Sequence, residues 1–186
     1  LSKNAEERID QLKHSGYRFE YWDGRKLMRM GEKLPKWSPN RHNLRDYQEE
    51  AVSNVFTAYS GGNRKALVVM ATGLGKTFVL SEVAVRMLQE DPERKVLILA
   101  HTLPLLKQLE CALWSQLPST APTQVWSGSD KPSSFDGITI GMFQTLHSAI
   151  GTLPLDQIPN FDTVMVDEAH HTAAVTFANV LEKVGN

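Results

Sequence analysis

The sequence has very little cysteine, because Cys111 is the only one among its 186 residues. A single cysteine excludes an intrachain disulfide and a cysteine-rich zinc site. Scarce cysteine is also typical of proteins that work in a reducing compartment. We therefore expect a cytoplasmic protein.

Long apolar runs are also lacking. None approaches the roughly 20 residues that a helix needs to cross a bilayer, and the polar opening "LSKNAEERID" is unlike a signal peptide. We therefore expect no membrane partner. The sequence does not begin with methionine, so we expect that it was cut from a longer protein.

The sequence also has no excess of positive or of negative charge. The formal net charge is −1 and the isoelectric point is near 6.7, so any contact with nucleic acid has to use a local basic patch. The length of 186 residues and the hydrophobic content of 41% are enough for a buried core. These values predict one globular domain with an extension.

Residues 1–43 read differently from the rest of the chain. A short polar helix is expected over 5–14, and the stretch "GEKLPKWSPNRHN" over 31–43 has the two prolines and the polar character of a linker. We assign 1–43 to an N-terminal extension and linker. Residues 44–186 form the main domain in this prediction.

From Leu44 onward, helical and strand patterns alternate. Apolar runs at 65–71, 95–101, 137–141 and 162–168 predict strands, and a shorter strand is expected at 123–128. Helical patterns cover 44–60, 76–90, 103–117 and 142–150. Continuous hydrophobicity in the strands indicates that both faces are covered, so the fold class is α/β, with a parallel sheet flanked by helices. Ligands of such sheets bind beyond the carboxyl ends of the strands.

The stretch "MATGLGKT" lies between the first of these apolar runs and a helix. Glycines let a backbone curl around an anion, and the N-terminus of the following helix attracts it. A lysine then supplies positive charge, and a threonine hydroxyl is a ligand for Mg²⁺. The alternative is an ordinary turn with a surface lysine. The candidate residues for nucleotide phosphate are Thr72, Gly73, Leu74, Gly75, Lys76 and Thr77.

The stretch "VMVDEAHH" ends another apolar run with two adjacent acids. Asp167 is expected to hold Mg²⁺ through water, and Glu168 to orient and deprotonate the attacking water. The alternative is a strand end with solvated carboxylates. Two motifs on different strands of one sheet favour a site for phosphate hydrolysis.

With both motifs placed, residues 44–186 resemble the first motor domain of superfamily 2 helicases and translocases, a RecA-like P-loop ATPase domain of the DEAH type. The phrasing "RKALVVMATGLGKT" and "VDEAHH" is most similar to restriction-type motors, including type I motor subunits and type III-like relatives. The resemblance implies ATP and Mg²⁺ as cofactors. It assigns adenine recognition to Arg45 and Gln48, and it makes Lys76 and Glu168 catalytic together with His170, which couples the nucleotide site to a partner domain.

Two further segments resemble nucleic-acid-binding motifs of the same superfamily. The first is "AHTLPLLKQ" and the second is "IGMFQTL". The first departs from the pattern at Leu103 and Pro104, and the second departs from it at Met142. The alternative is that both segments only pack the core. The residues that the resemblance assigns to nucleic acid are Thr102, Lys107, Gln108, Gln144 and Thr145.

The sequence ends sixteen residues after His170, before the Ser-Ala-Thr motif and the second RecA-like domain of the superfamily. We therefore expect an incomplete motor domain, truncated before motif III, from an ATP-dependent helicase or translocase. Duplex DNA is the expected partner, and hydrolysis is expected only with the second motor domain. The alternatives are an RNA helicase or sensor-type ATPase, and a nucleotide-gated nucleic-acid-binding module without turnover.

Overall fold

The computed structural model of the chain describes residues 3–18, 26, 29–30, 43–118, 121–128, 131–154, 157–168 and 175–185. The chain divides into two compact units, Leu1–Trp37 and Ser38–Asn186, and each is described by itself. In the first unit, helix α1 (Lys3–His14) covers the helix predicted over 5–14. Gly16, two residues beyond its last residue, has a φ of +86°, which suits the glycine that commonly follows the end of a helix.

The second unit is built on a parallel sheet, as the sequence predicts. Its four strands have the order β2-β3-β1-β4. The register places Ala100 beside Met142 and Leu99 beside Val166. The strands are β1 (Val96–Ala100), β2 (Thr123–Trp126), β3 (Ile138–Met142) and β4 (Thr163–Val166).

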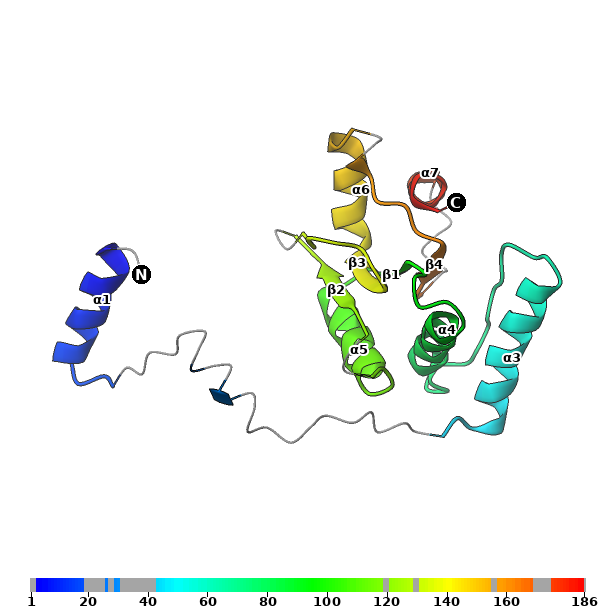
Figure 1. Cartoon of the computed structure of the whole chain (residues 1–186), viewed down its shortest axis with the longest axis horizontal. Coiled ribbons are helices and arrows are strands. Elements are labelled where there is room, and N and C mark those ends of the chain that lie inside the picture. Colours follow the sequence, from blue (N-terminus) through cyan, green and yellow to red (C-terminus); the bar gives the residue numbers. More distant parts are fainter. Residues whose placement is uncertain are drawn as a thin grey trace. The chain divides into compact units, whose positions relative to one another are not determined.

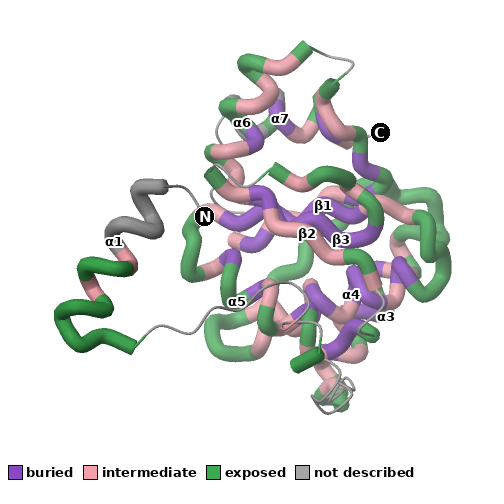
Figure 2. Tube along the Cα trace, turned by 60° about the vertical axis from the view of Figure 1, so that its left-hand side comes forward, coloured by how far each residue is buried: buried purple, intermediate pink, exposed green. Residues whose placement is uncertain are grey.

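Helices cover both faces of this sheet (Figure 1). Side chains of β1 alternate between two core clusters, since Ile98 joins one and Leu99 the other. The first cluster contains residues of α4 (Lys76–Glu90) and α5 (Leu103–Trp114). The second contains residues of α6 (Phe143–Thr152) and α7 (Val175–Val184). Figure 2 shows the buried residues concentrated along the central strands and on the inward sides of these helices.

Helix α3 (Asp46–Ser60) lies outside this arrangement and packs on α4. Val52 and Val55 of α3 join a core cluster with Val79 and Val83 of α4. Helix α3 ends at Ser60 with Gly61 as its C-cap, which agrees with the predicted end at residue 60. The predicted bounds of α4 agree with the observed ones at both ends.

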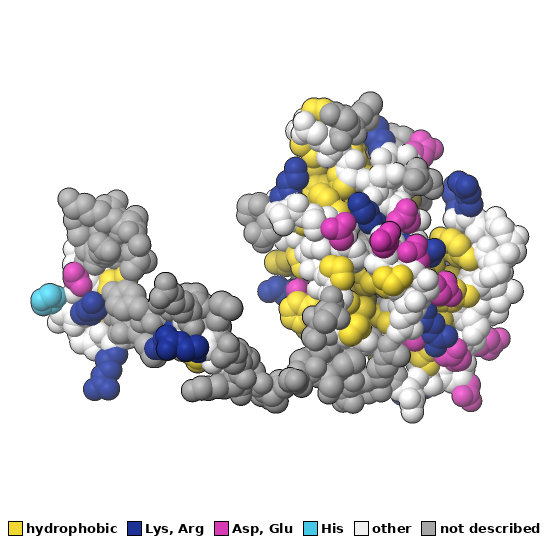
Figure 3. Space-filling view, viewed as in Figure 1, with side chains coloured by type: hydrophobic (Ala, Val, Ile, Leu, Met, Phe, Trp, Pro, Cys, Tyr) yellow, Lys and Arg dark blue, Asp and Glu magenta, His cyan; other side chains and the backbone are white. Residues whose placement is uncertain are grey.

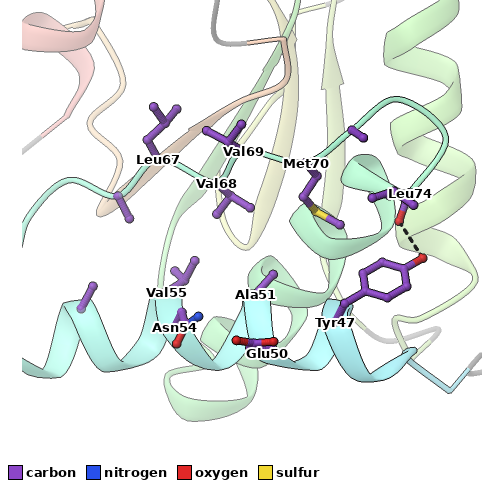
Figure 4. Close-up of a pocket in the computed structure, with 13 residues that line it drawn as sticks. Tyr47, Glu50, Ala51, Asn54, Val55, Leu67, Val68, Val69, Met70 and Leu74 are labelled. Carbon is purple, nitrogen blue, oxygen red and sulfur yellow. Dashed lines mark hydrogen bonds between the residues drawn. The ribbon is translucent and has the colours of Figure 1, made fainter.

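One predicted strand is wrong. Residues 65–71 belong to none of the four strands, although their apolar run predicts one. Leu67 is 75% exposed and Val69 is 84% exposed. Figure 4 shows that these two side chains point away from α3, whereas Val68 points toward it. The physical reason is that a strand needs hydrogen-bonded neighbours, and no strand of the described part of the chain pairs with this segment.

The carboxyl ends of the strands meet at one edge of the sheet. Thr102 follows β1, Gln144 follows β3 and Asp167 follows β4 directly. This edge therefore gathers residues from separate motifs, as expected for a parallel sheet. Among the helices of the described residues, none is both long and apolar enough to pass through a bilayer.

Candidate nucleotide site

The phosphate loop is a tight curl that leads into α4. Gly73 has a φ of +84° and Gly75 a φ of +83°, values that favour glycine over every other residue. Gly75 is the N-cap of α4, and its carbonyl oxygen accepts from the N–H groups of Phe78 and Val79, each at 3.0 Å. The first N–H groups of any helix lack partners within the helix and carry its positive dipole end. The loop therefore ends in a site suited to an anion.

Asp167 lies at the end of β4 and is only 6% exposed. Its N–H donates to the carbonyl of Leu99 at 3.1 Å, which fixes it beside β1. One carboxylate oxygen accepts from the N–H of Glu168 at 3.0 Å. The other lies 3.5 Å from the hydroxyl oxygen of Thr77. Two residues that are 90 positions apart in the sequence thus share one place in the fold.

Magnesium takes oxygen ligands and usually keeps several of its waters. The hydroxyl of Thr77 and the carboxylate of Asp167 are oxygen donors at hydrogen-bond distance from each other. This donor set fits a magnesium ion. Thr77 and Asp167 are therefore the residues that would hold the ion.

Glu168 has an unusual backbone. Of the non-glycine residues that the structure describes, it alone has a positive φ, 57°. This left-handed region costs an L-residue about 1 to 2 kcal/mol, and such strain occurs often at functional sites. The carboxylate of Glu168 lies 3.7 Å from the ammonium nitrogen of Lys76, with 30% and 35% of the two side chains exposed. The predicted phosphate-binding and water-orienting groups are therefore neighbours.

The start of α3 lies against the phosphate loop. Gln48 donates from Nε2 to the carbonyl of Leu74 at 2.9 Å, and its Oε1 accepts from the N–H of Arg45 at 3.0 Å. Gln48 is only 8% exposed. A glutamine amide has two N–H groups and two lone pairs on its oxygen, so one of each is left for a nucleobase. The role of Gln48 in adenine recognition stays a prediction.

Tyr47 is a contact that the sequence prediction missed. Its hydroxyl accepts from Nη1 of Arg45 at 3.2 Å and donates to the carbonyl of Leu74 at 3.4 Å (Figure 4). Two side chains of α3 thus reach one backbone oxygen of the loop. In the sequence, Tyr47 is only one residue of the helical pattern at 44–60, and a hydrogen bond to a backbone carbonyl cannot be predicted from residue types.

A second missed feature is an ion-pair network between α3 and α4. The guanidinium of Arg86 donates to both carboxylate oxygens of Glu49, at 2.7 and 2.6 Å, and to Glu82 at 2.8 Å. The hydrogen bonds from Arg86 are the main reason why the pKa of the Glu49 carboxyl lies below its ordinary value. The hydrogen bonds to Glu49 likewise raise the pKa of Arg86 above its usual range.

The residues assigned to nucleic acid lie near the same edge of the sheet. The hydroxyl oxygen of Thr102 accepts from the N–H of Leu105 at 3.4 Å and caps α5. The hydroxyl oxygen of Thr145 accepts from the N–H of Gly128 at 2.9 Å. Both threonine hydroxyls therefore stabilise the local backbone. Exposed side chains in the same two helices belong to Lys107, Gln108 and Gln144.

His170 and the rest of "AHH" lie outside the described residues. Its predicted coupling role therefore stays a prediction. On the face visible in Figure 3, basic and acidic side chains are interspersed over the unit Ser38–Asn186. That mixture agrees with the nearly neutral composition of the chain.

Several proteins of known sequence are similar to this chain. The protein irc3 of Schizosaccharomyces pombe, designated a mitochondrial ATP-dependent helicase, is 28% identical over 145 residues, which are 76% of this chain and 23% of irc3. The type I restriction enzyme EcoAI endonuclease subunit of Escherichia coli is 29% identical over 137 residues, 70% of this chain and 16% of that subunit. The chain thus spans less than a quarter of the length of these relatives.

Solved structures share the fold. The UvsW helicase of bacteriophage T4 has a TM-score of 0.60 at 21% identity and covers 95% of this chain and 65% of its own. The SWI2/SNF2 ATPase core of Sulfolobus solfataricus, solved with double-stranded DNA, has a TM-score of 0.62 at 19% identity, over 82% of this chain and 32% of its own. The type ISP restriction-modification enzyme LlaGI, solved as a nuclease-deletion mutant with a DNA substrate mimic, has a TM-score of 0.61 at 21% identity, over 77% of this chain and 17% of its own.

These likenesses confirm the RecA-like fold of superfamily 2 motor domains. They also agree with the restriction-type phrasing of the motifs. The family described as "Type III restriction enzyme, res subunit" matches residues 41–186. The chain therefore belongs to this family, whose relatives include ATP-dependent helicases.

Proposed function

We propose that this chain is the ATP-binding part of a motor that moves along duplex DNA, and that it binds Mg-ATP with the residues named above. The observation that supports this most strongly is the approach of Thr77 to Asp167, at 3.5 Å, beside the pair of Lys76 and Glu168 at 3.7 Å. Four side chains with complementary roles in phosphate chemistry come from two distant motifs. If the two motifs were only an ordinary turn and a solvated strand end, these four side chains would not be expected to lie together.

In the proposed mechanism, the glycines and the N-terminus of α4 enclose the phosphates, and the ammonium of Lys76 pairs with their outer oxygens. Thr77 and Asp167 would hold a magnesium ion there, and the ion would neutralise charge that develops on the phosphates. We expect the ammonium of Lys76 to pair with phosphate in place of Glu168 when nucleotide binds, because the phosphates carry more negative charge than one carboxylate. Glu168 then accepts a hydrogen bond from the attacking water and removes its proton.

We further propose that rapid hydrolysis needs a second motor domain. An arginine supplied across a cleft stabilises the charge of the transferring phosphoryl group and can raise the rate by about 10³ to 10⁵. The relatives that match this chain are four or more times as long as the matched part, since the chain covers 23% of one and 16% of another. That length leaves room for such a domain in the relatives.

Duplex DNA is the proposed track. The support comes from proteins similar to this chain, among them an ATP-dependent DNA helicase of Candida albicans that is 36% identical over 84 residues, 44% of this chain and 7% of that helicase, and from two structures solved with DNA or its mimic. Protein contacts with duplex DNA go largely to the phosphate backbone and release counterions, so DNA binding should weaken as the salt concentration rises. Thr102, Lys107, Gln108, Gln144 and Thr145 are the proposed contacts.

The test is steady-state phosphate release by the full-length protein that contains this sequence, with duplex DNA, with single-stranded RNA and with neither. We expect duplex DNA to give the largest stimulation. The Glu168→Gln variant is the control, because it keeps the volume of the side chain and removes the base. Greater stimulation by RNA would support the RNA helicase alternative. Tight binding of ATP and DNA without turnover would support the binding module.

A further inference from the structure

Arg86 and Glu49 form a two-pronged contact between α4 and α3. Nη1 and Nη2 of Arg86 reach Oε1 and Oε2 of Glu49 at 2.7 and 2.6 Å, while Nε donates to Glu82 at 2.8 Å. Glu82 lies one turn earlier on α4, so its bond orients the guanidinium from the same helix. A planar fork that meets a carboxylate in this way fixes both distance and angle. The contact therefore sets how far along α4 the start of α3 lies.

The rest of the contact between the two helices cannot do this alone. Val52 and Val55 meet Val79 and Val83 in an apolar cluster. The hydrophobic effect that favours their burial is not directional, whereas the hydrogen bonds of the ion pair are. The ion pair supplies the missing direction.

The start of α3 is also the part that reaches the phosphate loop. Gln48 precedes Glu49 directly and donates to the carbonyl of Leu74 at 2.9 Å. A Cβ at Gly75 would lie 2.7 Å from Nε2 of Gln48, which shows how closely the amide and the loop backbone approach. The loop continues into α4 at Lys76, ten residues before Arg86. Loop, α4, Arg86, Glu49 and Gln48 thus form a closed ring of contacts.

We propose that Glu49 and Arg86 are positioning residues for the nucleotide site, and that they act through Gln48 to hold the phosphate loop in its binding-competent curl. Neither residue belongs to the phosphate loop itself. Their effect is to keep the loop from opening between binding events. The link to nucleotide affinity rests on the function proposed above, whereas the link to loop order does not.

The experiment compares Glu49→Ala with Glu82→Ala. Both remove one carboxylate from Arg86, but only Glu49→Ala cuts the connection between helices, and in each variant Arg86 keeps one partner. The affinity for Mg-ATP is measured on the 186-residue chain with a fluorescent ATP analogue. We expect Glu49→Ala to weaken the affinity for Mg-ATP about tenfold, since even a small displacement of binding groups is costly. Glu82→Ala should change the affinity less than about twofold. In a Gln48→Ala background, Glu49→Ala should have no further effect, because coupled residues are not additive.

Amide hydrogen exchange without nucleotide gives a second measurement. Residues 71–79 should exchange faster in Glu49→Ala than in the wild type, and Glu82→Ala should leave their rates unchanged. Equal rates in all three proteins would overturn the proposal, and so would a loss of affinity in Glu49→Ala that persists in full without the Gln48 side chain. A wild-type chain that binds no Mg-ATP would contradict the proposed function instead. In that event the exchange rates still decide whether the pair orders the loop.

Discussion

Gly75 offers a direct measure of how tightly α3 is fitted to the phosphate loop. Its φ of +83° disfavours any side chain, and an added Cβ would lie 2.7 Å from Nε2 of Gln48. Gly73 is a matched control from the same loop. Its φ is +84°, and a Cβ there would meet nothing within 4 Å. Alanine at Gly73 therefore introduces backbone strain alone, whereas alanine at Gly75 adds a collision with Gln48.

The size of each effect follows from these contacts. The left-handed backbone costs an alanine about 1 to 2 kcal/mol, and this cost applies at both positions. At Gly75 the amide of Gln48 also has to move away from the carbonyl of Leu74 and from the N–H of Arg45. Each neutral hydrogen bond contributes about 1 kcal/mol net. We therefore expect Gly75→Ala to destabilise the chain by about 1 to 2 kcal/mol more than Gly73→Ala.

The assay is urea unfolding of both variants. A difference between their midpoint urea concentrations reports a difference in stability if the m-value is the same. The same pair is then measured in a Gln48→Ala background, where the collision partner is gone. There the two glycine substitutions should cost the same. Equal losses in the wild-type background would refute the reasoning. A difference that survives removal of the Gln48 side chain would refute it as well.

Three further predictions concern the charged residues. Lys76→Ala should abolish binding of Mg-ATP and leave the melting temperature nearly unchanged, because its partly exposed pair with Glu168 contributes about 1 kcal/mol or less. Retained affinity in a titration would remove Lys76 from the site. Glu168→Gln in the full-length protein should bind ATP but not turn it over, and hydrolysis at the wild-type rate would exclude Glu168 as the water-orienting group. The pKa of Glu49 lies below its ordinary value of 4.5 because of Arg86, so its stabilisation is present above that value and is lost as the pH falls through the folded-state pKa. Acid should therefore lower the free energy of unfolding of the wild type more than that of Glu49→Gln, and equal acid dependence in urea titrations would contradict the role of the pair.

Much of the fold could be predicted from local patterns. The helix over Lys76–Glu90 has the predicted ends, because Gly75 supplies the left-handed N-cap and the polar "QE" precedes an extended Asp91. The strands near Val96 and Ile138 are predicted correctly from their continuous apolar runs. The structure buries these runs on both faces of the sheet. These elements depend on residues close in sequence. Local chemistry is therefore enough to identify them.

The predictions that failed or were missed depend on distant partners. The run at 65–71 has the composition of a buried strand, but pairing decides whether it becomes one, and composition does not reveal the neighbour. The hydrogen bond from Gln48 goes to the backbone carbonyl of Leu74. Every residue has such a carbonyl, so residue types do not identify the acceptor. Arg86 and Glu49 are 37 residues apart. Each is an ordinary charged residue on a helix surface until the two helices are packed together.

The exposed run at 65–71 also affects how the chain behaves at high concentration. Leu67 and Val69 present branched apolar side chains to water, and an unpaired segment of this kind is a template for pairing with the same segment of another molecule. Arg64 immediately before the run and Lys65 at its first position are the charged residues that oppose stacking of identical segments. Their repulsion weakens as salt screens it. The colloidal stability of this chain is therefore expected to fall with ionic strength, so that low salt favours dispersed molecules.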